Sequence, residues 1–411
     1  MTEAVQTNDL VYDPGDPETM ANPFPIYARL REEDPVHWCP SLKSWIVTRY
    51  DDVRDLLLSD TLSVRRLMQF YATLPARDAE LLHDIIHYLD LWLAFRDPPD
   101  HTRVRRILRH AFAPDAVDQL RPGIEEIVTH LLDDIAAQGR DRIDLIPDFA
   151  GRVPAYVIMD MLGVPRDMLA EVKAWSDDMA VFIGGSRNAA DKYARAADGC
   201  KKMAAYFRAL IAARIADPQP GFLQDLILAR DEGDQLSEDE LVATCILILF
   251  AGHETTTNLI GNAALLLLRH PEQLALLRAD PDLIDSAIEE VLRFDGPTNA
   301  LVRVVARGHT LEGRQMREGD RVFVMVNSAN RDPRAFAEPE RFDIRRNPNR
   351  HMTFGQGIHV CLGARLARAE GRIAVQQLFD RFPGLALDGA PRWLDAMVPR
   401  GTVSLPLRLR P

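Results

Sequence analysis

The sequence has few cysteines and no excess of basic residues. Only four of its 411 residues are cysteine: Cys39, Cys200, Cys245 and Cys361. So few cysteines, at irregular spacing, exclude a disulfide scaffold and fit a reducing cytosol. The net charge of −12 argues against nucleic acid as a general partner.

The chain also lacks the apolar segments of a membrane protein. Its longest apolar run, residues 241–252, is well short of the roughly 20 residues needed to span a bilayer. The N-terminal segment M-T-E-A-V-Q-T-N-D-L has neither a basic nor an apolar signal-peptide region. We therefore expect a cytoplasmic, soluble protein without a membrane anchor.

No linker, charge block or internal repeat divides the chain. Its length alone is compatible with two or three domains of about 150 residues each. The hydrophobic content of 47% is ample for one large core. We predict a single domain over residues 1–411.

One glycine-spaced loop carries the strongest signal. Residues 354–364 read F-G-Q-G-I-H-V-C-L-G-A, and a helix-forming run follows from Leu362 to Gln377. The glycines allow positive φ and the close approach of a bulky planar ligand. Helix N-terminal amides and the helix dipole favour the thiolate of Cys361, and a thiolate is a good axial ligand for haem iron. The ordinary alternative for a lone cysteine is a small buried hydrophobe.

A second pattern breaks the rules of a buried helix. The capping box S-E-D-E at residues 237–240 opens a helix that ends near His270. The first half is apolar on nearly all sides, which predicts burial. Residues 251–257, A-G-H-E-T-T-T, then place a glycine, a charge and three β-branched hydroxyls where they disfavour a helix. Such a departure indicates function, with a capped kink without chemistry as the alternative.

Five motifs occur in an order typical of one family. They are H-x-x-x-R at His101 and Arg105, A-G-H-E-T-T at residues 251–256, E-x-x-R at Glu290 and Arg293, P-E-R-F around Arg341, and the cysteine loop. Together they resemble the cytochrome P450 family of haem-thiolate monooxygenases, over nearly the whole chain. The resemblance implies a mainly α fold with small β-sheets and a long central helix over the haem.

The resemblance assigns many residues to haem b, with Cys361 as the axial ligand of the iron. The other cofactor-binding residues would be His101, Arg105, Ala251, Gly252, Arg303, His351, Phe354, Gly355, His359 and Gly363. The basic ones would hold the haem propionates, which suit Arg–carboxylate pairing. A satisfied loop histidine is an equal alternative for His351. Glu290, Arg293 and Arg341 would form a buried network that braces the proximal side.

The resemblance also implies oxygen activation on the distal side of the haem. Thr255 would hydrogen-bond the activated oxygen, and Glu254 with ordered water would feed protons to it. One oxygen atom would enter a C–H or C=C bond of a small apolar organic substrate. We expect the substrate pocket to include Leu89, Trp92, Phe182, Leu247, Thr298, Asn299 and Val398.

Electrons must come from another protein, because the sequence shows no fused flavin domain and no second cysteine cluster. We expect an acidic ferredoxin with its NAD(P)H-dependent reductase, docked on a basic patch. The expected patch residues are Arg103, Arg106, Arg109, Arg365, Arg368 and Arg372.

Other functions remain open on the same fold. They are a peroxide-driven peroxygenase or isomerase, against which the intact Glu254-Thr255 pair speaks, and a non-catalytic haem protein. A zinc hydrolase that uses His351, His359 and Cys361 has no matching tetrahedral spacing.

Turn and periodicity signals predict the remaining elements. They are an extended lead-in over residues 13–25, an antiparallel pair at 36–38 and 45–48, an irregular stretch at 60–95, a helix interruption at Phe182-Ile183-Gly184-Gly185, hairpins over 310–326 with turns at Glu312-Gly313 and Glu318-Gly319, and a C-terminal hairpin from Val398.

Overall fold

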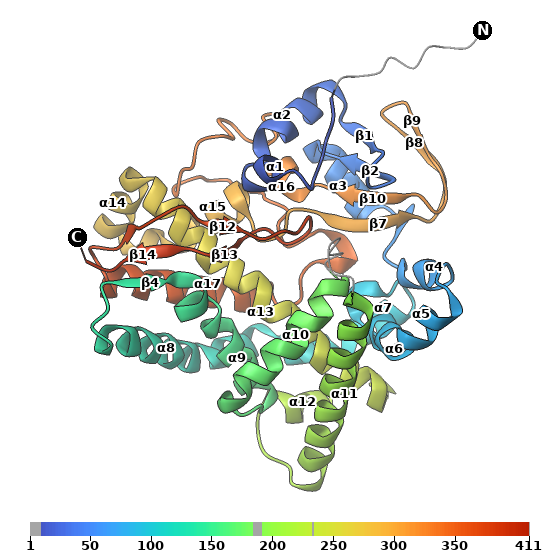
Figure 1. Cartoon of the computed structure of the whole chain (residues 1–411), viewed down its shortest axis with the longest axis horizontal. Coiled ribbons are helices and arrows are strands. Elements are labelled where there is room, and N and C mark those ends of the chain that lie inside the picture. Colours follow the sequence, from blue (N-terminus) through green and yellow to red (C-terminus); the bar gives the residue numbers. More distant parts are fainter. Residues whose placement is uncertain (1–9, 184–190, 232–233, 411) are drawn as a thin grey trace.

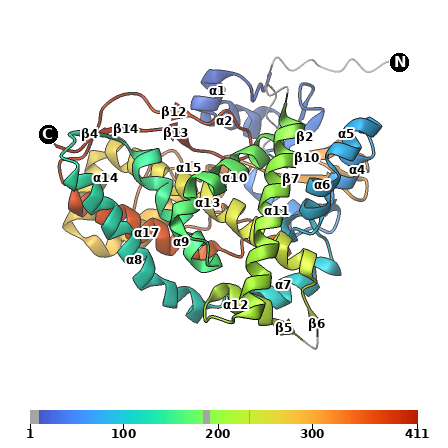
Figure 2. The ribbon, with the colours of Figure 1, turned by 60° about the horizontal axis from the view of Figure 1, so that its bottom comes forward.

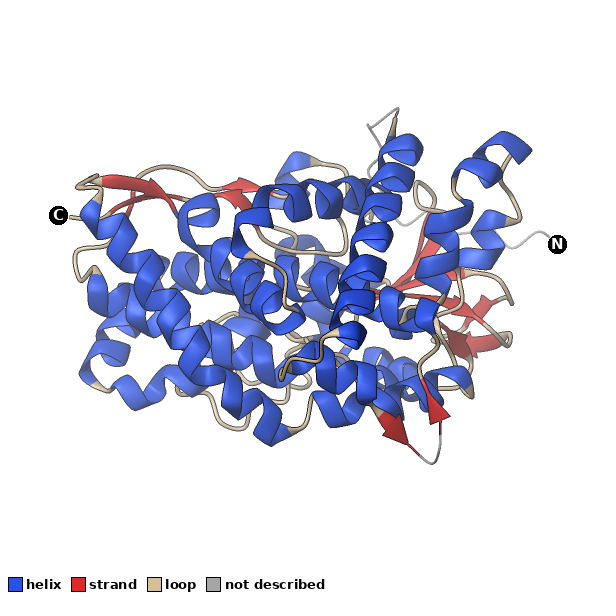
Figure 3. Ribbon diagram, turned by 90° about the horizontal axis from the view of Figure 1, so that it is seen from below, coloured by secondary structure: helices blue, strands red, loops and turns tan. Residues whose placement is uncertain are grey.

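The computed structural model describes residues 10–183, 191–231 and 234–410. Helices dominate the molecule, and the strands gather in separate small sheets (Figure 1, Figure 3). The α-helices are α1 (Pro17–Ala21), α2 (Phe24–Glu33), α3 (Tyr50–Leu58), α4 (Leu67–Tyr71), α5 (Ala76–Leu81), α6 (His83–Asp90), α7 (Asp100–Ala111), α8 (Pro114–Ala137), α9 (Arg152–Leu162), α10 (Leu169–Ile183), α11 (Lys192–Ala216), α12 (Phe222–Leu228), α13 (Glu238–Arg269), α14 (Pro271–Ala279), α15 (Ile284–Asp295), α16 (Val326–Ala329) and α17 (Ala364–Arg381). Short helical turns are η1 (Leu93–Phe95), the π-helical η2 (Ile146–Ala150), η3 (Arg166–Met168), η4 (Pro281–Leu283) and η5 (Gly357–His359).

The strands form one larger sheet and several ladders of two or three strands. They are β1 (Val36–Cys39), β2 (Ser44–Val47), β3 (Leu62–Ser63), β4 (Arg142–Asp144), β5 (Arg230–Asp231), β6 (Asp234–Gln235), β7 (Leu301–Val305), β8 (His309–Leu311), β9 (Arg314–Met316), β10 (Arg321–Val324), β11 (Ala386–Leu387), β12 (Arg392–Trp393), β13 (Thr402–Ser404) and β14 (Pro406–Arg408). The larger sheet has the order β1-β2-β10-β7-β3. The predicted antiparallel pair of β1 and β2 is confirmed, with Trp38 opposite Trp45.

Helix α13 crosses the middle of the molecule, with α10 and α11 lying side by side over it (Figure 1, Figure 2). Its predicted capping box is present: the Glu240 N–H donates to the Ser237 hydroxyl, and the Ser237 N–H donates to the Glu240 carboxylate. Its apolar first half is almost entirely buried, and α9, α11, α15 and α17 pack against it. This burial explains why α13 needs no polar face.

Three local predictions need correction. The lead-in contains α1, because Asp16 caps its N-terminus and Pro17 occupies its first position. Residues 60–95 are regular, since they form β3, α4, α5, α6 and η1. The hairpin β8–β9 turns at Glu312-Gly313 as predicted. The Glu318-Gly319 turn instead leads into β10, which pairs with β7 and β2.

The predicted C-terminal hairpin is also wrong. Strand β13 pairs with β12, while β14 pairs with β11 and β4. The chain changes partner at Leu405, whose N–H donates to the Asp144 carboxylate and whose carbonyl accepts from the Leu145 N–H. The predicted interruption at Gly184-Gly185 lies outside the described residues. Among the helices that the structure describes, none has the length and apolarity to cross a membrane.

Candidate active site

A large cavity lies between α13 and the cysteine loop. Its volume is about 400 Å³, within the roughly 300–1,000 Å³ of a usual small-molecule pocket. Its wall includes these predicted site residues: Arg105, Leu247, Ala251, Gly252, Thr255, Thr298, Arg303, Phe354, Gly355, His359, Cys361, Gly363 and Val398. One cavity therefore joins the cysteine loop, the α13 segment and the predicted basic residues.

The cysteine loop is held by its own backbone. Gly355 and Gly357 take φ of 75° and 69°, as their sequence position predicts. The Cys361 N–H donates to the Phe354 carbonyl at 2.8 Å, which closes the loop. A Cβ on Gly363 would meet no atom within 4 Å, so this side of the sulfur faces open space.

The sulfur of Cys361 faces into the cavity. Burial raises the pKa of its thiol, although the Gly363 N–H and the charges of Arg105 and Arg368 act in the opposite direction. An iron cation bound to the sulfur would favour its thiolate form further.

On the opposite wall, α13 presents a flat surface made by Ala251 and Gly252. A Cβ on Gly252 would lie 2.8 Å from Ile158 Cδ1, so glycine also permits the close packing of α13 on α9. The Thr255 hydroxyl donates to the Ala251 carbonyl at 2.8 Å, the bond to residue i−4 that its position predicts. That bond uses the hydroxyl hydrogen, so Thr255 faces the cavity as a hydrogen-bond acceptor.

Glu254 lies on the other side of α13 and is absent from the cavity wall. Burial raises the pKa of its carboxyl, the Asp177 carboxylate raises it further, and Lys173 lowers it. Lys173 and Asp177 form an exposed ion pair of 2.6 Å on α10. Glu254 therefore lies between this surface pair and the inner face of α13.

A cluster of basic side chains lines one end of the cavity. Arg66, Arg105, Arg303 and His359 belong to its wall, and the His101 ring lies 4.4 Å from that of His359. Both ring nitrogens of His101 are buried without a hydrogen-bond partner in the described part of the chain. Burial, helped by the charge of Arg303, lowers the pKa of His359 to about 3.

This cluster fits the carboxylates of haem b. Asp97 is the acid that lies close to it, with Oδ1 3.9 Å from His359 Nε2. Three arginines and one aspartate leave two positive charges, which two haem propionates would neutralise. A propionate would also accept a hydrogen bond from the N–H of the His101 ring, which has no partner among the described residues. The residues present therefore fit the cofactor that the resemblance implies.

His351 lies away from this cluster, so its assignment to a propionate is corrected. Its Nε2 lies 3.0 Å from the Glu289 carboxylate, and its side chain is buried outside the cavity wall. His351 is therefore a satisfied loop histidine. The zinc alternative fails as well, because the described residues contain no group of three His, Cys, Asp or Glu placed to hold a metal ion.

Four predicted substrate residues do not line the cavity. Leu89 is fully buried in the core. Trp92 stacks behind Phe95, which takes its place in the wall. Phe182 packs its ring against Phe70 and Tyr193.

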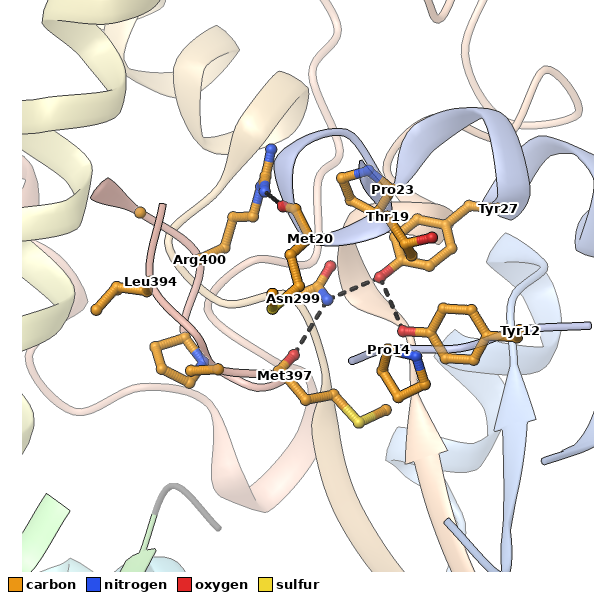
Figure 4. A pocket seen from close by; sticks show the side chains of 13 residues that line it. Tyr12, Pro14, Thr19, Met20, Pro23, Tyr27, Asn299, Leu394, Met397 and Arg400 are labelled. Atoms are coloured by element: carbon orange, nitrogen blue, oxygen red, sulfur yellow. Dashed lines mark hydrogen bonds between the residues drawn. The ribbon is translucent and has the colours of Figure 1, made fainter. Parts of the chain in front are cut away.

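Asn299 is the fourth of these residues, and Figure 4 shows its surroundings. Its amide nitrogen donates to the Tyr27 hydroxyl at 2.7 Å and to the Met397 carbonyl at 3.1 Å. It thus turns away from the cavity, which its chain neighbour Thr298 lines. The alternation of side chains along an extended segment explains the difference between the two residues.

The buried bracing network is present with one different member. Arg293 donates to both carboxylate oxygens of Glu290 at 2.7 and 2.8 Å, and both side chains have no exposed surface. The second arginine is Arg346, 3.2 Å from Glu290. Arg341 was predicted there, but its side chain is exposed and pairs with Glu338. Only its carbonyl joins the network, by accepting from Arg293.

The predicted docking patch is partly neutralised. Arg103 pairs with Glu240 and Asp234, and Arg368 makes two hydrogen bonds to Glu289 of 2.6 and 2.9 Å. Arg372 pairs with Asp285. Arg109 and Arg365 are exposed.

Two ionisable wall residues were not predicted from the sequence, Glu370 and Arg66. Glu370 is buried, lines the cavity and has a carboxylate oxygen without a partner among the described residues. Burial raises the pKa of its carboxyl well above the ordinary value. Its spacing of four from the buried Leu366 on α17 would have indicated an inward carboxyl. For Arg66, the other of these residues, no sequence pattern distinguishes it from its neighbour Arg65 as an inward-facing side chain.

Comparisons with known proteins agree with this geometry. The family model described as "Cytochrome P450" matches residues 56–389. Cytochrome P450 107B1 of Saccharopolyspora erythraea is 40% identical over 390 residues, 93% of this chain and 94% of the relative. Vitamin D(3) 25-hydroxylase of Pseudonocardia autotrophica is 41% identical over 370 residues, 89% of this chain and 88% of the relative.

Solved structures show the same fold. P450BioI, in complex with an acyl carrier protein ligated to hexadec-9Z-enoic acid, aligns with a TM-score of 0.88 at 36% identity, covering 96% of this chain and 99% of that one. Epothilone D-bound P450epoK aligns with a TM-score of 0.89 at 31% identity, covering 97% and 99%. With the cysteine loop, the basic cluster and the α13 surface on one cavity, the chain belongs to the cytochrome P450 family and is a haem-b-binding monooxygenase.

Proposed function

We propose that the protein inserts one atom of O₂ into a neutral or anionic, largely apolar organic substrate, with electrons from a ferredoxin and its reductase. The observation that carries this proposal is the cavity itself. Cys361 lies on one wall, Thr255 and Gly252 lie on another, and apolar side chains line most of the rest. Haem b, when bound, supplies the oxygen-activating chemistry.

The roles of individual side chains follow from their positions. The Cys361 sulfur binds the iron, and Arg105, Arg303, His101 and His359 hold the propionates. Thr255 accepts hydrogen bonds on the distal side, because its own hydrogen is donated to Ala251. These residues bind and orient, and the apolar wall limits the access of water.

Glu254 is placed to move protons inward. Its carboxyl lies near the surface pair Lys173–Asp177, and its raised pKa brings protonation closer to neutral pH. Rotation of the side chain toward Thr255, its neighbour in sequence, would carry a proton to the inner face of α13. Glu254→Gln is expected to lower turnover while substrate binding stays unchanged.

The charges on the wall restrict the substrate. The described wall residues include three arginines, Arg66, Arg105 and Arg303, which the haem propionates would neutralise, and one acid, Glu370, whose carboxyl pKa is raised by burial. A substrate bearing an ammonium group finds no counter-charge there, whereas a neutral or carboxylate-bearing one meets no repulsion. Relatives whose names refer to polyketide biosynthesis or to a fatty acyl chain support a lipid-like or polyketide-like class.

A spectral screen tests the substrate class. Apolar candidates such as steroids, polyketides and fatty acids are added to the haem-bound protein, and the substrate-induced change in spin state is measured. Matched amine-bearing analogues are expected to bind more weakly. Amines that bind as tightly as their neutral counterparts would contradict the charge argument.

Product analysis tests the reaction. A substrate identified in the screen, incubated with O₂, NAD(P)H, ferredoxin and reductase, should gain one oxygen atom. Turnover with peroxide but none with any ferredoxin would identify the peroxygenase alternative. The intact Glu254-Thr255 pair favours the O₂-dependent reaction.

The ferredoxin is proposed to dock beside the cysteine loop. Arg365 lies in the first turn of α17, four residues beyond Cys361, and Arg109 is exposed near the end of α7. Reversing both to Glu is expected to raise the apparent KM for ferredoxin severalfold at low salt, and less at high salt. Arg392→Glu with Arg408→Glu, changes at exposed arginines of β12 and β14, is the charge-matched control. An unchanged KM for the double variant would contradict this site.

A further inference from the structure

Arg66 is a half-buried cation that belongs to none of the five sequence motifs. It follows β3 and directly precedes α4, and it lies in the cavity wall. Its guanidinium donates to the Val302 carbonyl at 3.3 Å and lies 4.5 Å from the centre of the Phe95 ring. Within the described residues, no carboxylate lies in ion-pair distance of it. Burial lowers its pKa to about 10, helped by the charge of Arg303.

A second guanidinium converges on the same oxygen. Arg303 also donates to the Val302 carbonyl, at 3.0 Å. Strands β3 and β7 pair side by side, so the chain after β3 returns Arg66 to the neighbourhood of Arg303. Two positive groups on one neutral acceptor, away from water, repel each other strongly. An anion between them would stabilise the arrangement.

The nearby carboxylate of Asp97 is not the anion between the two guanidinium groups. Asp97 accepts hydrogen bonds from the Ser63 hydroxyl and the Val64 N–H, so it holds the backbone that leads to Arg66. The anion must therefore come from a molecule bound in the cavity. A carboxylate fits best, because two guanidinium groups can each donate to its oxygens.

We propose that Arg66 and Arg303 together clamp one propionate of the haem, and that this clamp fixes the start of α4 to the cofactor. The inference rests on the proposed haem site and adds a ligand from a segment outside the family motifs. Bound haem would then also stabilise the helices that cover the cavity. The ring centroids of Phe70 on α4 and Phe182 on α10 lie 5.8 Å apart, so an anchored α4 supports α10.

Arg65 provides a matched control. It is the preceding residue, it is exposed, and it pairs with Asp100 at 2.7 Å outside the cavity wall. We expect Arg66→Gln to accelerate haem transfer to an excess of apomyoglobin about tenfold or more, and Arg65→Gln to leave the rate near that of the wild type. Arg66→Lys keeps the positive charge but cannot donate two parallel hydrogen bonds as a guanidinium does, so its rate of haem transfer should lie between those of the wild type and Arg66→Gln.

Limited proteolysis gives a second readout that does not depend on activity. Cleavage within residues 66–81 should be faster in haem-bound Arg66→Gln than in the haem-bound wild type and Arg65→Gln. If Arg66→Gln does not fold, Arg66→Lys decides: haem loss at least threefold faster supports the clamp, and the wild-type rate overturns it.

The outcomes separate this inference from the proposed function. A wild-type protein that binds no haem would refute the function itself. Wild-type haem retention in Arg66→Gln would refute only the clamp. Unchanged haem loss combined with weaker binding of a fatty-acid anion, but not of its methyl ester, would assign Arg66 to the substrate and also overturn the clamp.

Discussion

The buried pair Glu290–Arg293 offers a test of how burial changes the contribution of an E-x-x-R ion pair to the free energy of unfolding. Arg293 makes five hydrogen bonds: two to the Glu290 carboxylate, and three to the carbonyls of Asn330, Pro339 and Arg341. Arg293→Met removes all five and leaves the Glu290 carboxylate buried. Breaking a buried pair in this way costs about 3–5 kcal/mol.

That loss is a large part of a typical stability of about 5–15 kcal/mol. The Glu290 carboxylate would retain the Asp343 N–H, Arg346 and Asn349 as partners, at 2.9, 3.2 and 3.2 Å. We therefore expect about 4 kcal/mol, near the middle of the range. Glu290→Gln combined with Arg293→Met removes the uncompensated charge, so the double variant should be less destabilised than the sum of the two single variants.

The assay is urea unfolding of the haem-bound protein, followed by tryptophan fluorescence at fixed haem stoichiometry. The matched control is Asp51–Arg54, which has the same order and i, i+3 spacing at 2.7 Å but is largely exposed. Asp51→Asn with Arg54→Gln should cost less than about 1 kcal/mol. If Arg293→Met costs no more than this control, or if the Glu290 and Arg293 variants are fully additive, the assigned role of burial is wrong.

Three further outcomes follow from the cavity and the proximal side. Cys361→Ser should abolish the red-shifted absorbance of the reduced, carbon-monoxide-treated protein, because a serine oxygen cannot replace the thiolate. Glu370→Gln should be more stable than the wild type at about pH 8 and similar below pH 4.5: the folded-state pKa is raised, so the wild type loses stability as pH rises above 4.5, at up to about 1.4 kcal/mol per pH unit. Burial would raise the pKa of Glu289, but hydrogen bonds from Arg368 and His351 lower it to about 2, so the stabilisation by its carboxylate is present above pH 4.5 and is lost as pH falls toward 2. In Glu289→Gln, the urea unfolding midpoint should therefore depend less on pH below 4.5 than in the wild type. An unchanged pH dependence would contradict the pairing.

Local sequence rules predicted the features that depend on neighbouring residues. The capping box at Ser237, the positive φ of Gly355 and the Thr255 bond to residue i−4 each arise within a few residues. The five motifs placed Cys361 and the α13 surface on one site because their combination is specific.

The failures concern residues whose side-chain direction is set by distant packing. Phe95 rather than Trp92 reaches the cavity, since η1 turns the chain between them. Arg346 rather than Arg341 reaches Glu290. Both arginines lie between α16 and η5, where the described chain has no helix or strand whose periodicity would predict side-chain direction. Arg66 was missed because its importance depends on Arg303, more than two hundred residues away in sequence.

The hydrogen-bonded chain in Figure 4 connects the N-terminal segment to the wall of the cavity. Tyr12 and Tyr27 have their hydroxyls 3.4 Å apart, Tyr27 accepts from Asn299, and the Asn299 backbone N–H donates to the Val398 carbonyl at 2.8 Å. Thr298 and Val398, on either side of that link, both touch the cavity. A change at Tyr12, remote from any bound molecule, can therefore reshape the wall, and efforts to alter the enzyme's substrate range should vary this outer tyrosine together with the inner residues.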